Sequence, residues 1–317
     1  MRIVAFLSDP VFSPPILEGL VKSRHSIAAV ITTPDSPSGR GMKLSPTVPA
    51  QMATEMGILV LKPQRLHDEG FLLDLTALKP DVGVVAAYPK FLPLAVLELP
   101  LQDCWNVHPS LLPRWRGAAP VQRALLAGDT VTGVTIMRMV EKMDAGEILL
   151  QEPTPILPTE DGEELLFRLA KIGAELLLTG LNMIEAGSYA LTPQDESKVT
   201  LAPKLVGEEA LLDWDQSCAE VVNRIRGVRP NLVAYSFWHG KRLQIFKAQI
   251  STMTPPDPFP PSGTMLVTRQ NLTIACSEDL IDLLSVRLEG KNIVTGAEFV
   301  RGARSIPGER LTSNPGG

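Results

Sequence analysis

Two polar side chains stand one residue apart in the segment NVHPSLLP, residues 106–113. Asn106 and His108 flank a valine in what reads as a β-strand, and Pro109 follows directly. Alternate residues of a strand point to one face, and proline cannot donate a ladder hydrogen bond, so the pair would emerge together at a strand end. Asparagine can donate to a developing oxyanion, and histidine can donate, accept or change charge near neutral pH. The pattern is typical of an oxyanion-stabilising site, and equally of a strand end with a capping asparagine and a half-buried histidine.

A carboxylate follows a later strand. Asp144 lies in an Asp-Ala-Gly turn after an expected strand at 132–139. If this strand neighbours 104–108 and a helix at 118–127 joins the two, Asp144 emerges at the same end of the sheet as His108. A carboxylate there could orient the imidazole and stabilise its protonated form, as in hydrolytic triads. The alternative is an ordinary turn, which this tripeptide also favours.

An open α/β sheet would position these side chains. Short runs rich in valine and isoleucine alternate with amphipathic segments, as in a mostly parallel, Rossmann-like sheet covered on both faces. The expected strands are 2–7, 26–32, 58–61, 81–87, 104–108 and 132–139, and the expected helices are 12–23, 47–56, 68–78 and 118–127. Such sheets bind ligands beyond the carboxyl ends of their strands. The first strand is followed by LSDPVFSP in place of GxGxxG, which excludes a dinucleotide site of that kind.

The pattern changes in the second half of the chain. A strand at 147–157 and a long amphipathic helix at 161–187 precede a polar, proline-containing stretch. After it, one helix leads into closely spaced short strands, typical of a small β-barrel of the OB type. These elements are expected at 215–228, 232–238, 242–250, 263–269, 271–277 and 280–287. We therefore predict a catalytic domain at 1–188, a linker at 189–206 and a carboxy-terminal OB-like domain at 207–317.

Composition narrows the class of protein. The 317 residues are 44% hydrophobic and 21% charged, as in folded proteins, and no apolar run approaches the roughly 18–20 residues that span a bilayer. Three cysteines and four histidines lie too far apart for a disulfide framework or a zinc site, which favours a reducing cytoplasm and no metal. Cys104 reads as a buried, inert thiol. The net charge of −5 argues against coating nucleic acid through bulk charge but allows local basic surfaces.

Residues 106–152 resemble the signature region of methionyl-tRNA formyltransferases. The similarity combines N-x-H, SLLP, RGAAP, TGVT and a D-x-G loop at that family's spacing. It extends over nearly the whole chain through TTPDSPSGRGMKLSPT, TPQDESKVTLAPKL, DWDQSCAEVVNRIRG and GAEFVRGARSIPGERL. N-x-H with a distant aspartate is also found in other enzymes that use the same folate. Sugar-nucleotide N-formyltransferases are the nearest alternative; the loop at 32–47, RGAAP and the carboxy-terminal domain together favour tRNA.

The resemblance implies formyl transfer from 10-formyltetrahydrofolate to the α-amino group of methionyl-initiator tRNA. In that family's mechanism, Asn106 and protonated His108 would donate to the oxyanion of a tetrahedral intermediate. Asp144 would hold His108 and assist proton removal from the amine, with no metal and no covalent enzyme intermediate. The SLLP segment would line the folate site, its backbone free because the strand has ended. The implied folate-binding residues are Ser110, Leu111, Leu112, Pro113 and Tyr88.

Basic residues that lack acidic neighbours in the sequence are the candidates for tRNA contact, because phosphate contacts supply much of the affinity for nucleic acid. They are Arg40, Lys43, Arg114, Arg116, Arg224, Arg226, Lys241 and Arg242. Ordinary solvated side chains would give the same pattern. The glycine- and proline-containing loop at 34–46 is expected to be irregular, and the resemblance implies that it inserts Arg40 near the acceptor end. We expect the protein to act as a monomer.

Three segments depart from the family pattern. LSDP stands at 7–10, Pro89 follows Tyr88, and RPNLVAY occupies 229–235. Pro89 removes an amide donor from a loop that the family places beside the folate. A catalytically inactive tRNA-binding protein is a further alternative, against which the intact Asn106, His108 and Asp144 argue.

Overall fold

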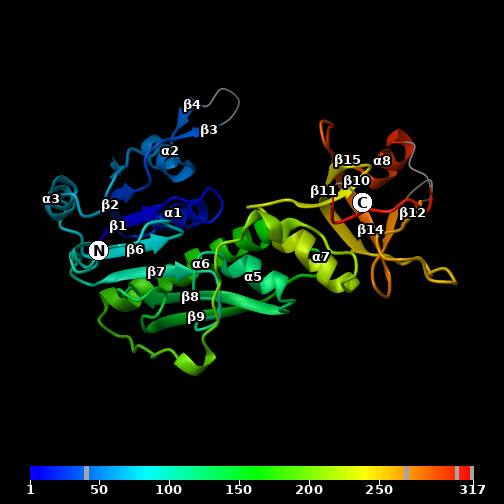
Figure 1. The fold of residues 1–317 in the computed structure, drawn as a ribbon. Helices are drawn as coiled ribbons and strands as arrows, with labels where there is room; N and C mark the ends of the chain where they lie inside the picture. The colour runs from blue at the N-terminus through cyan, green and yellow to red at the C-terminus, as the bar shows by residue number, and fades with distance from the viewer. Residues whose placement is uncertain (39–42, 268–270, 304–306, 315–317) are drawn as a thin grey trace. The chain divides into compact units, whose positions relative to one another are not determined.

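The computed structural model describes residues 1–38, 43–267, 271–303 and 307–314. The chain divides into two compact units (Figure 1). The first unit comprises Met1–Pro120, Val131–Pro155 and Glu164–Pro203, and the second comprises Val121–Thr130, Ile156–Glu163 and Lys204–Gly317. Residues 189–203, expected to be a linker, therefore belong to the first unit. None of the helices described is long and apolar enough to cross a bilayer.

A seven-stranded sheet organises the first unit, in the order β5-β2-β1-β6-β7-β8-β9. The strands are β1 (Arg2–Leu7), β2 (Ser26–Ile31), β5 (Val60–Leu61), β6 (Val82–Ala86), β7 (Cys104–His108), β8 (Val131–Arg138) and β9 (Ile148–Pro155). The pairs from β5 to β7 are parallel, whereas β7 with β8 and β8 with β9 are antiparallel. The predicted open, mostly parallel α/β sheet is confirmed.

Helices cover both faces of this sheet (Figure 1). They are α1 (Ser13–Lys22), α2 (Val48–Glu55), α3 (Glu69–Ala77), α4 (Leu94–Leu97) and α6 (Gly162–Glu185). A Cβ on Gly173 of α6 would lie 2.8 Å from Cγ1 of Val107, so α6 packs tightly on the face to which odd-numbered β7 residues point. Residues of α3 and α4 pack on the other face, in one apolar cluster with Phe6 and Cys104. By alternation, Asn106 and His108 project on this second face.

The segment that was expected to be irregular between residues 34 and 46 contains a short hairpin. β3 (Ser36–Ser38) and β4 (Lys43–Ser45) pair antiparallel. The prolines at 37 and 46 do not prevent this pairing, because proline is tolerated in an edge strand or beyond its end. Arg40 lies outside the described residues, as does the side chain of Lys43.

A curled antiparallel sheet forms the core of the second unit, in the order β10-β11-β14-β13-β12. The strands are β10 (Ala234–Trp238), β11 (Lys241–Ile250), β12 (Met265–Val267), β13 (Leu272–Ala275), β14 (Leu280–Leu288) and β15 (Val294–Thr295), which pairs with β14. The helices are α5 (Pro120–Leu126), α7 (Cys218–Gly227) and α8 (Gly296–Ala303). This half-barrel confirms the predicted small β-domain. α8 was not anticipated.

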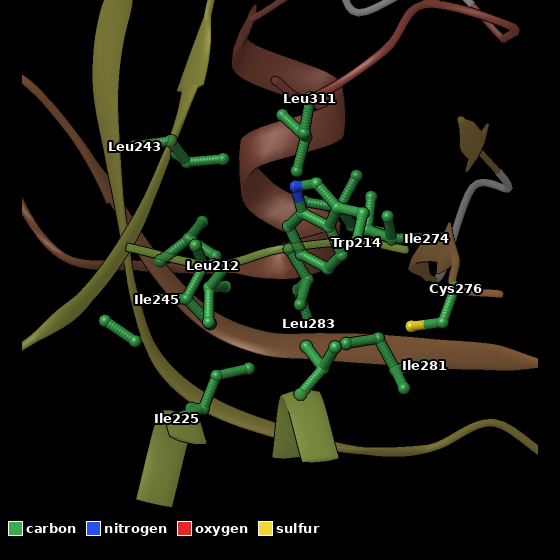
Figure 2. Packing of buried hydrophobic residues seen from close by; sticks show 14 of the residues in the cluster. Leu212, Trp214, Ile225, Leu243, Ile245, Ile274, Cys276, Ile281, Leu283 and Leu311 are labelled. Carbon is green, nitrogen blue, oxygen red and sulfur yellow. The ribbon is translucent and has the colours of Figure 1, made fainter. Parts of the chain in front are cut away.

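Trp214 lies at the centre of the second unit's core (Figure 2). Its ring packs among the aliphatic side chains that the figure labels, and its Nε1 donates to Ser236 Oγ at 2.9 Å, which satisfies the polar atom of a buried indole. α7 begins with a capping box, in which Ser217 and Glu220 satisfy each other's backbone amides. The capping box satisfies backbone groups at the amino end of a helix whose side chains Cys218, Val221 and Ile225 pack in the core of the second unit.

Because β6 packs closely beside β7, a side chain added at Gly83 should lower the stability of the protein. A Cβ on Gly83 would overlap Sγ of Cys104, so Gly83→Ala should cost about 1–3 kcal/mol through overpacking. The double variant with Cys104→Ala should be more stable than the sum of the single changes, because the overlapping sulfur is gone. Denaturant unfolding measures both. Gly70→Ala, on α3 with open space around its Cα, is the control and should not destabilise; strictly additive effects would contradict the packing interpretation.

Candidate active site

The imidazole of His108 is fixed at the carboxyl end of β7. It is 4% exposed, and its Nε2 lies 3.0 Å from the carbonyl oxygen of Trp115. A carbonyl can only accept, so Nε2 must carry a hydrogen. Nδ1 faces Oδ2 of Asp144 at 3.9 Å, which is too long for a hydrogen bond. Nδ1 is therefore the ring nitrogen left available for chemistry.

Asp144 reaches His108 by a route other than the one expected. β8 runs antiparallel to β7, with His108 opposite Thr135 and Trp105 opposite Arg138. The end of β8 thus lies beside the start of β7, and the premise of a parallel crossover through a helix at 118–127 was wrong. The helix is present as α5, but most of it belongs to the second unit. Asp144 and His108 meet because the loop after β8 turns back along the sheet.

The backbone around this pair adopts conformations that most residues avoid. Trp115 has φ 65°, Asp144 has φ 49° and Gly117 has φ 130°. Trp115 supplies the carbonyl that holds His108, and the Gly117 N–H donates to Asp144 Oδ2 at 2.8 Å. A Cβ at position 117 would lie 2.6 Å from the oxygen of Ala202, so only glycine fits. Left-handed backbone at non-glycine residues costs about 1–3 kcal/mol each and gathers at functional sites.

Asn106 offers an uncommitted amide beside the imidazole. It is half-buried on the same face of β7 as His108, next to Val85 of β6 and Met137 of β8. None of the residues that the structure describes forms a hydrogen bond with its side chain. A half-buried amide without a partner, beside a histidine with one free nitrogen, can donate to an oxygen that develops negative charge.

The SLLP segment is attached to the sheet through a row of polar side chains. Thr135, opposite His108, donates from Oγ1 to the Ser110 carbonyl at 2.7 Å and accepts from the Leu112 N–H at 3.1 Å. Gln151, opposite Thr135 on β9, donates to the Leu112 carbonyl at 2.8 Å. The backbone of this segment is therefore largely engaged, and the expectation that it is free to bind folate was wrong.

Two residues of the TGVT motif explain why SLLP fits against the sheet. Gly133 leaves room for the side chain of Leu111, whose Cδ2 would lie 2.5 Å from a Cβ at position 133. Thr135 supplies the hydroxyl that binds the SLLP backbone. Sequence reasoning quoted this motif without assigning its residues a role, and it missed Gln151 altogether. The alternation of TGVT, which puts Gly133 and Thr135 on one face, was the available signal.

Comparisons with known proteins show to which family the chain is similar. The "Formyl transferase" family model matches residues 1–181, and the "Formyl transferase, C-terminal domain" model matches residues 204–304. A methionyl-tRNA formyltransferase of Moorella thermoacetica is 40% identical over 312 residues, covering 98% of this chain and 99% of the relative. One from Syntrophus aciditrophicus is 41% identical over 308 residues, covering 97% and 98%.

The chain belongs to the methionyl-tRNA formyltransferase family.

Solved structures with low sequence identity share the fold. HypX from Aquifex aeolicus, in complex with tetrahydrofolic acid, matches with a TM-score of 0.67 at 18% identity over 95% of this chain and 48% of HypX, so the chain spans about half of that protein. An N-formyltransferase from Helicobacter canadensis, in complex with folinic acid and dTDP-3-aminofucose, matches with a TM-score of 0.65 at 15% identity, covering 89% of this chain and 98% of that one. These likenesses concern the fold alone.

Tyr88 points into the apolar cluster under the sheet. Its ring packs edge-on against Phe6 at 5.5 Å, and its hydroxyl is buried without a hydrogen-bond partner among the described residues. Burial raises the pKa of Tyr88 to about 12. The hydroxyl is therefore a donor that no described residue uses, on the residue that precedes Pro89.

Cys104 is a candidate nucleophile on the same strand as His108. Cys104 lies four residues before His108 on the same face of β7 and is buried, and burial raises the pKa of its thiol to about 12. The thiol is thus protonated at neutral pH, as the sequence reading expected. Within the described ranges, no group of three or more His, Cys, Asp or Glu side chains could hold a metal ion.

Of the eight basic residues singled out from the sequence, the six whose side chains the structure describes fall into two groups. Arg114, Lys241 and Arg242 are exposed. The Arg114 guanidinium lies 4.9 Å from the Trp115 ring centre and that of Arg242 lies 3.5 Å from the Tyr235 ring centre. The other three, Arg116, Arg224 and Arg226, are buried or half-buried and donate to groups within their own unit.

Removal of two different threonine hydroxyls from β8 should have different effects on stability. Thr135→Val removes the partner of Ser110 and Leu112 and should cost about 1–3 kcal/mol, with a fall in activity, because buried backbone groups lose their hydrogen bonds. Thr132→Val is the matched control: the Thr132 hydroxyl is buried without a described partner, so its loss should be neutral or stabilising. Denaturant unfolding and an activity assay test the pair. Equal losses for both variants would contradict the proposed attachment of SLLP.

Proposed function

We propose that the chain transfers the formyl group of 10-formyltetrahydrofolate to the α-amino group of methionyl-initiator tRNA. The observation that carries this proposal is the 40% identity, over almost the full length of both chains, with methionyl-tRNA formyltransferases. The arrangement of Asn106, His108 and Asp144 at one end of β7 supports it, since acyl transfer requires a donor set aimed at an oxyanion.

Asn106 and His108 form the oxyanion-binding pair in this mechanism. The amine adds to the formyl carbon, a nitrogen–carbon bond forms, and the π electrons of the carbonyl move to its oxygen. The Asn106 amide and the Nδ1–H of protonated His108 donate to that oxygen. The oxyanion then re-forms the carbonyl, the bond between the formyl carbon and the folate nitrogen breaks, and that nitrogen takes up the proton that the amine has lost. Because Nε2 is committed to Trp115, the reaction uses the Nδ1 edge of the ring.

Asp144 stabilises the imidazolium and takes part in removing the proton from the attacking amine. Its Oδ2 lies 3.9 Å from Nδ1, too far to occupy the hydrogen of that nitrogen. The Gly117 N–H fixes the carboxylate, which is 14% exposed at the side chain. Proton removal runs through water, because the carboxylate is already oriented toward Gly117 and His108.

The folate-binding part of the proposal comprises Tyr88 and the SLLP residues, Ser110, Leu111, Leu112 and Pro113. Because Thr135 and Gln151 bind the backbone of SLLP, this segment would contact the folate through side chains held in a fixed position, and its backbone would not be the main donor. The half-buried side chains of Leu111 and Pro113 are the surfaces it can offer. The Tyr88 hydroxyl, which has no hydrogen-bond partner among the described residues, belongs to the residue before Pro89, which itself has no N–H to donate.

The tRNA-binding part rests on exposed cations. Arg114, Lys241 and Arg242 retain this role, together with Arg40 and Lys43, whose side chains lie outside the described residues. Arg116, Arg224 and Arg226 act mainly inside the protein. A monomer in the cytoplasm completes the proposal; the three free, buried cysteines support a reducing compartment.

Removal of the Asn106 amide should lower kcat by about 10²–10³, with little change in KM for the folate, because the amide acts on charge that develops only in the transition state. Steady-state formylation of initiator methionyl-tRNA measures this for Asn106→Ala and His108→Ala. Asn182→Ala, an exposed asparagine on α6, is the control and should keep the parental kcat. A near-parental kcat for Asn106→Ala would remove the residue from the mechanism.

The same assay separates the alternatives. A sugar-nucleotide enzyme would formylate an amino-sugar nucleotide in preference to methionyl-tRNA. An inactive tRNA-binding protein would show only the uncatalysed rate with both. Transfer to methionyl-tRNA that depends on His108 is the outcome expected here.

Arg242→Ala should raise KM for methionyl-tRNA and leave KM for the folate unchanged. If Arg242 contacts a phosphate, the slope of log affinity against log salt should also become shallower by about 1. Lys22→Ala, an exposed lysine on α1 that forms an ion pair with Glu18, is the control. If neither KM nor the slope of log affinity against log salt changed, the proposal that β11 contacts tRNA would be wrong.

A further inference from the structure

The loop that contains Asp144 is held by a side chain from residues 192–202, far along the chain. Gln194 donates from Nε2 to two carbonyl oxygens, of Asp144 at 2.8 Å and of Gly146 at 2.7 Å. Both hydrogens of its amide are thereby used, and both acceptors belong to the turn that presents the carboxylate. Gly146 has no space for a side chain, because a Cβ there would overlap the carbonyl oxygen of Arg138. The turn is thus fixed from two sides.

Arg116 fixes the orientation of the Gln194 amide. Its Nε and Nη2 donate to Gln194 Oε1 at 3.0 and 2.8 Å, so the oxygen faces the guanidinium and the nitrogen faces the carbonyls. Arg116 is only 4% exposed, and Nη2 also donates to Glu196 at 2.7 Å. This guanidinium, expected from the sequence to contact tRNA, instead supports the interior of the first unit.

Arg116 also lies between the two residues that orient the catalytic pair. Trp115 holds His108 through its carbonyl, and Gly117 holds Asp144 through its N–H. The backbone of Arg116 pairs with residues 200 and 202, so main chain and side chain are both fixed. One residue therefore connects the segment that positions the imidazole with the turn that positions the carboxylate.

Glu196 completes the network at its exposed end. Its carboxylate accepts from Arg116 and, at 2.9 Å, from Lys142, which precedes the Asp144 turn. Hydrogen bonds from Arg116 and Lys142 lower the pKa of Glu196 to about 2, so this carboxylate stays charged at any working pH. The guanidinium thus keeps a permanent counter-charge while it binds the neutral amide.

We propose that Gln194, oriented by Arg116, is a positioning residue that sets the distance and angle between Asp144 and His108 during formyl transfer. The inference rests on the catalytic roles proposed above for those two residues. Two observations show why Asp144 needs such support. Its backbone has φ 49°, and no hydrogen bond joins its carboxylate to His108 among the described contacts. A carboxylate so placed depends on its backbone, and the Gln194 amide holds that backbone directly.

Gln194→Glu is the sharpest test, because it keeps size and shape while replacing the donor by an acceptor. The new carboxylate would face the carbonyls of Asp144 and Gly146 and should displace the turn. We expect kcat to fall by about 10²-fold, the usual effect of a misplacement near 1 Å, while KM for both substrates changes by less than about twofold. Gln51→Glu, an exposed glutamine on α2, is the matched control and should leave kcat unchanged.

A double-variant cycle separates positioning from a general structural role. Gln194 acts through Asp144, so Gln194→Glu should have almost no further effect on kcat in an Asp144→Asn background. An additive loss would overturn the proposal, as would a parental kcat for Gln194→Glu. If Gln194→Glu fails to fold, as monitored by thermal unfolding, Gln194→Met replaces it, with the same cycle and the same expected outcome.

The cycle also distinguishes failure of this inference from failure of the proposed function. If Asp144→Asn keeps the parental kcat, the proposed catalytic role of Asp144 is wrong and the positioning role falls with it. If Asp144→Asn is slow and Gln194→Glu is not, the catalytic role stands and only the positioning role is overturned.

Discussion

The hydrogen bond between His108 Nε2 and the Trp115 carbonyl decides which edge of the imidazole can do chemistry. A carbonyl accepts but cannot donate, so it fixes both the ring and its hydrogen. Trp115, which supplies this carbonyl, has a left-handed backbone. The Trp115 N–H donates to Thr200 Oγ1 at 2.9 Å, and the next residue pairs with the backbone of residue 200. A strand-end histidine therefore depends on a segment almost a hundred residues later in the chain.

The direction of β8 has a comparable influence. An antiparallel β8 puts Thr135 directly across from His108, and β9 then puts Gln151 across from Thr135. Cross-strand partners share a face, so the three polar side chains form one row at the end of the sheet. The row binds the backbone of SLLP and closes one side of the site. A parallel strand in the same place would have offered neither the row nor the return loop that brings Asp144 to His108.

How much of this the sequence predicts depends on how local each feature is. Alternation along β7 predicts that Asn106 and His108 share a face, and the strand has the bounds expected for it. Strand direction is set by packing between distant segments, so the reasoning that placed Asp144 near His108 used a wrong premise to reach a contact that does exist. Gln194 lies fifty residues from Asp144, and no periodicity or motif marks its amide as the partner of that turn.

The basic residues show the same limit, because the charges that surround them also come from distant segments of the chain. A stretch of sequence with basic but no acidic residues predicts unpaired cations only if no acidic side chain approaches from elsewhere in the chain. Folding brings several acidic side chains close to these arginines. Glu196 meets Arg116, and within the second unit Asp161 meets Arg229 at 2.8 Å. These arginines are favoured inside because a planar fork can satisfy several acceptors at once, which a lysine cannot do. The cations left for phosphate are those whose backbone position keeps them outside, such as Arg242 at the start of β11, where a neighbouring tyrosine face supports the guanidinium without neutralising it.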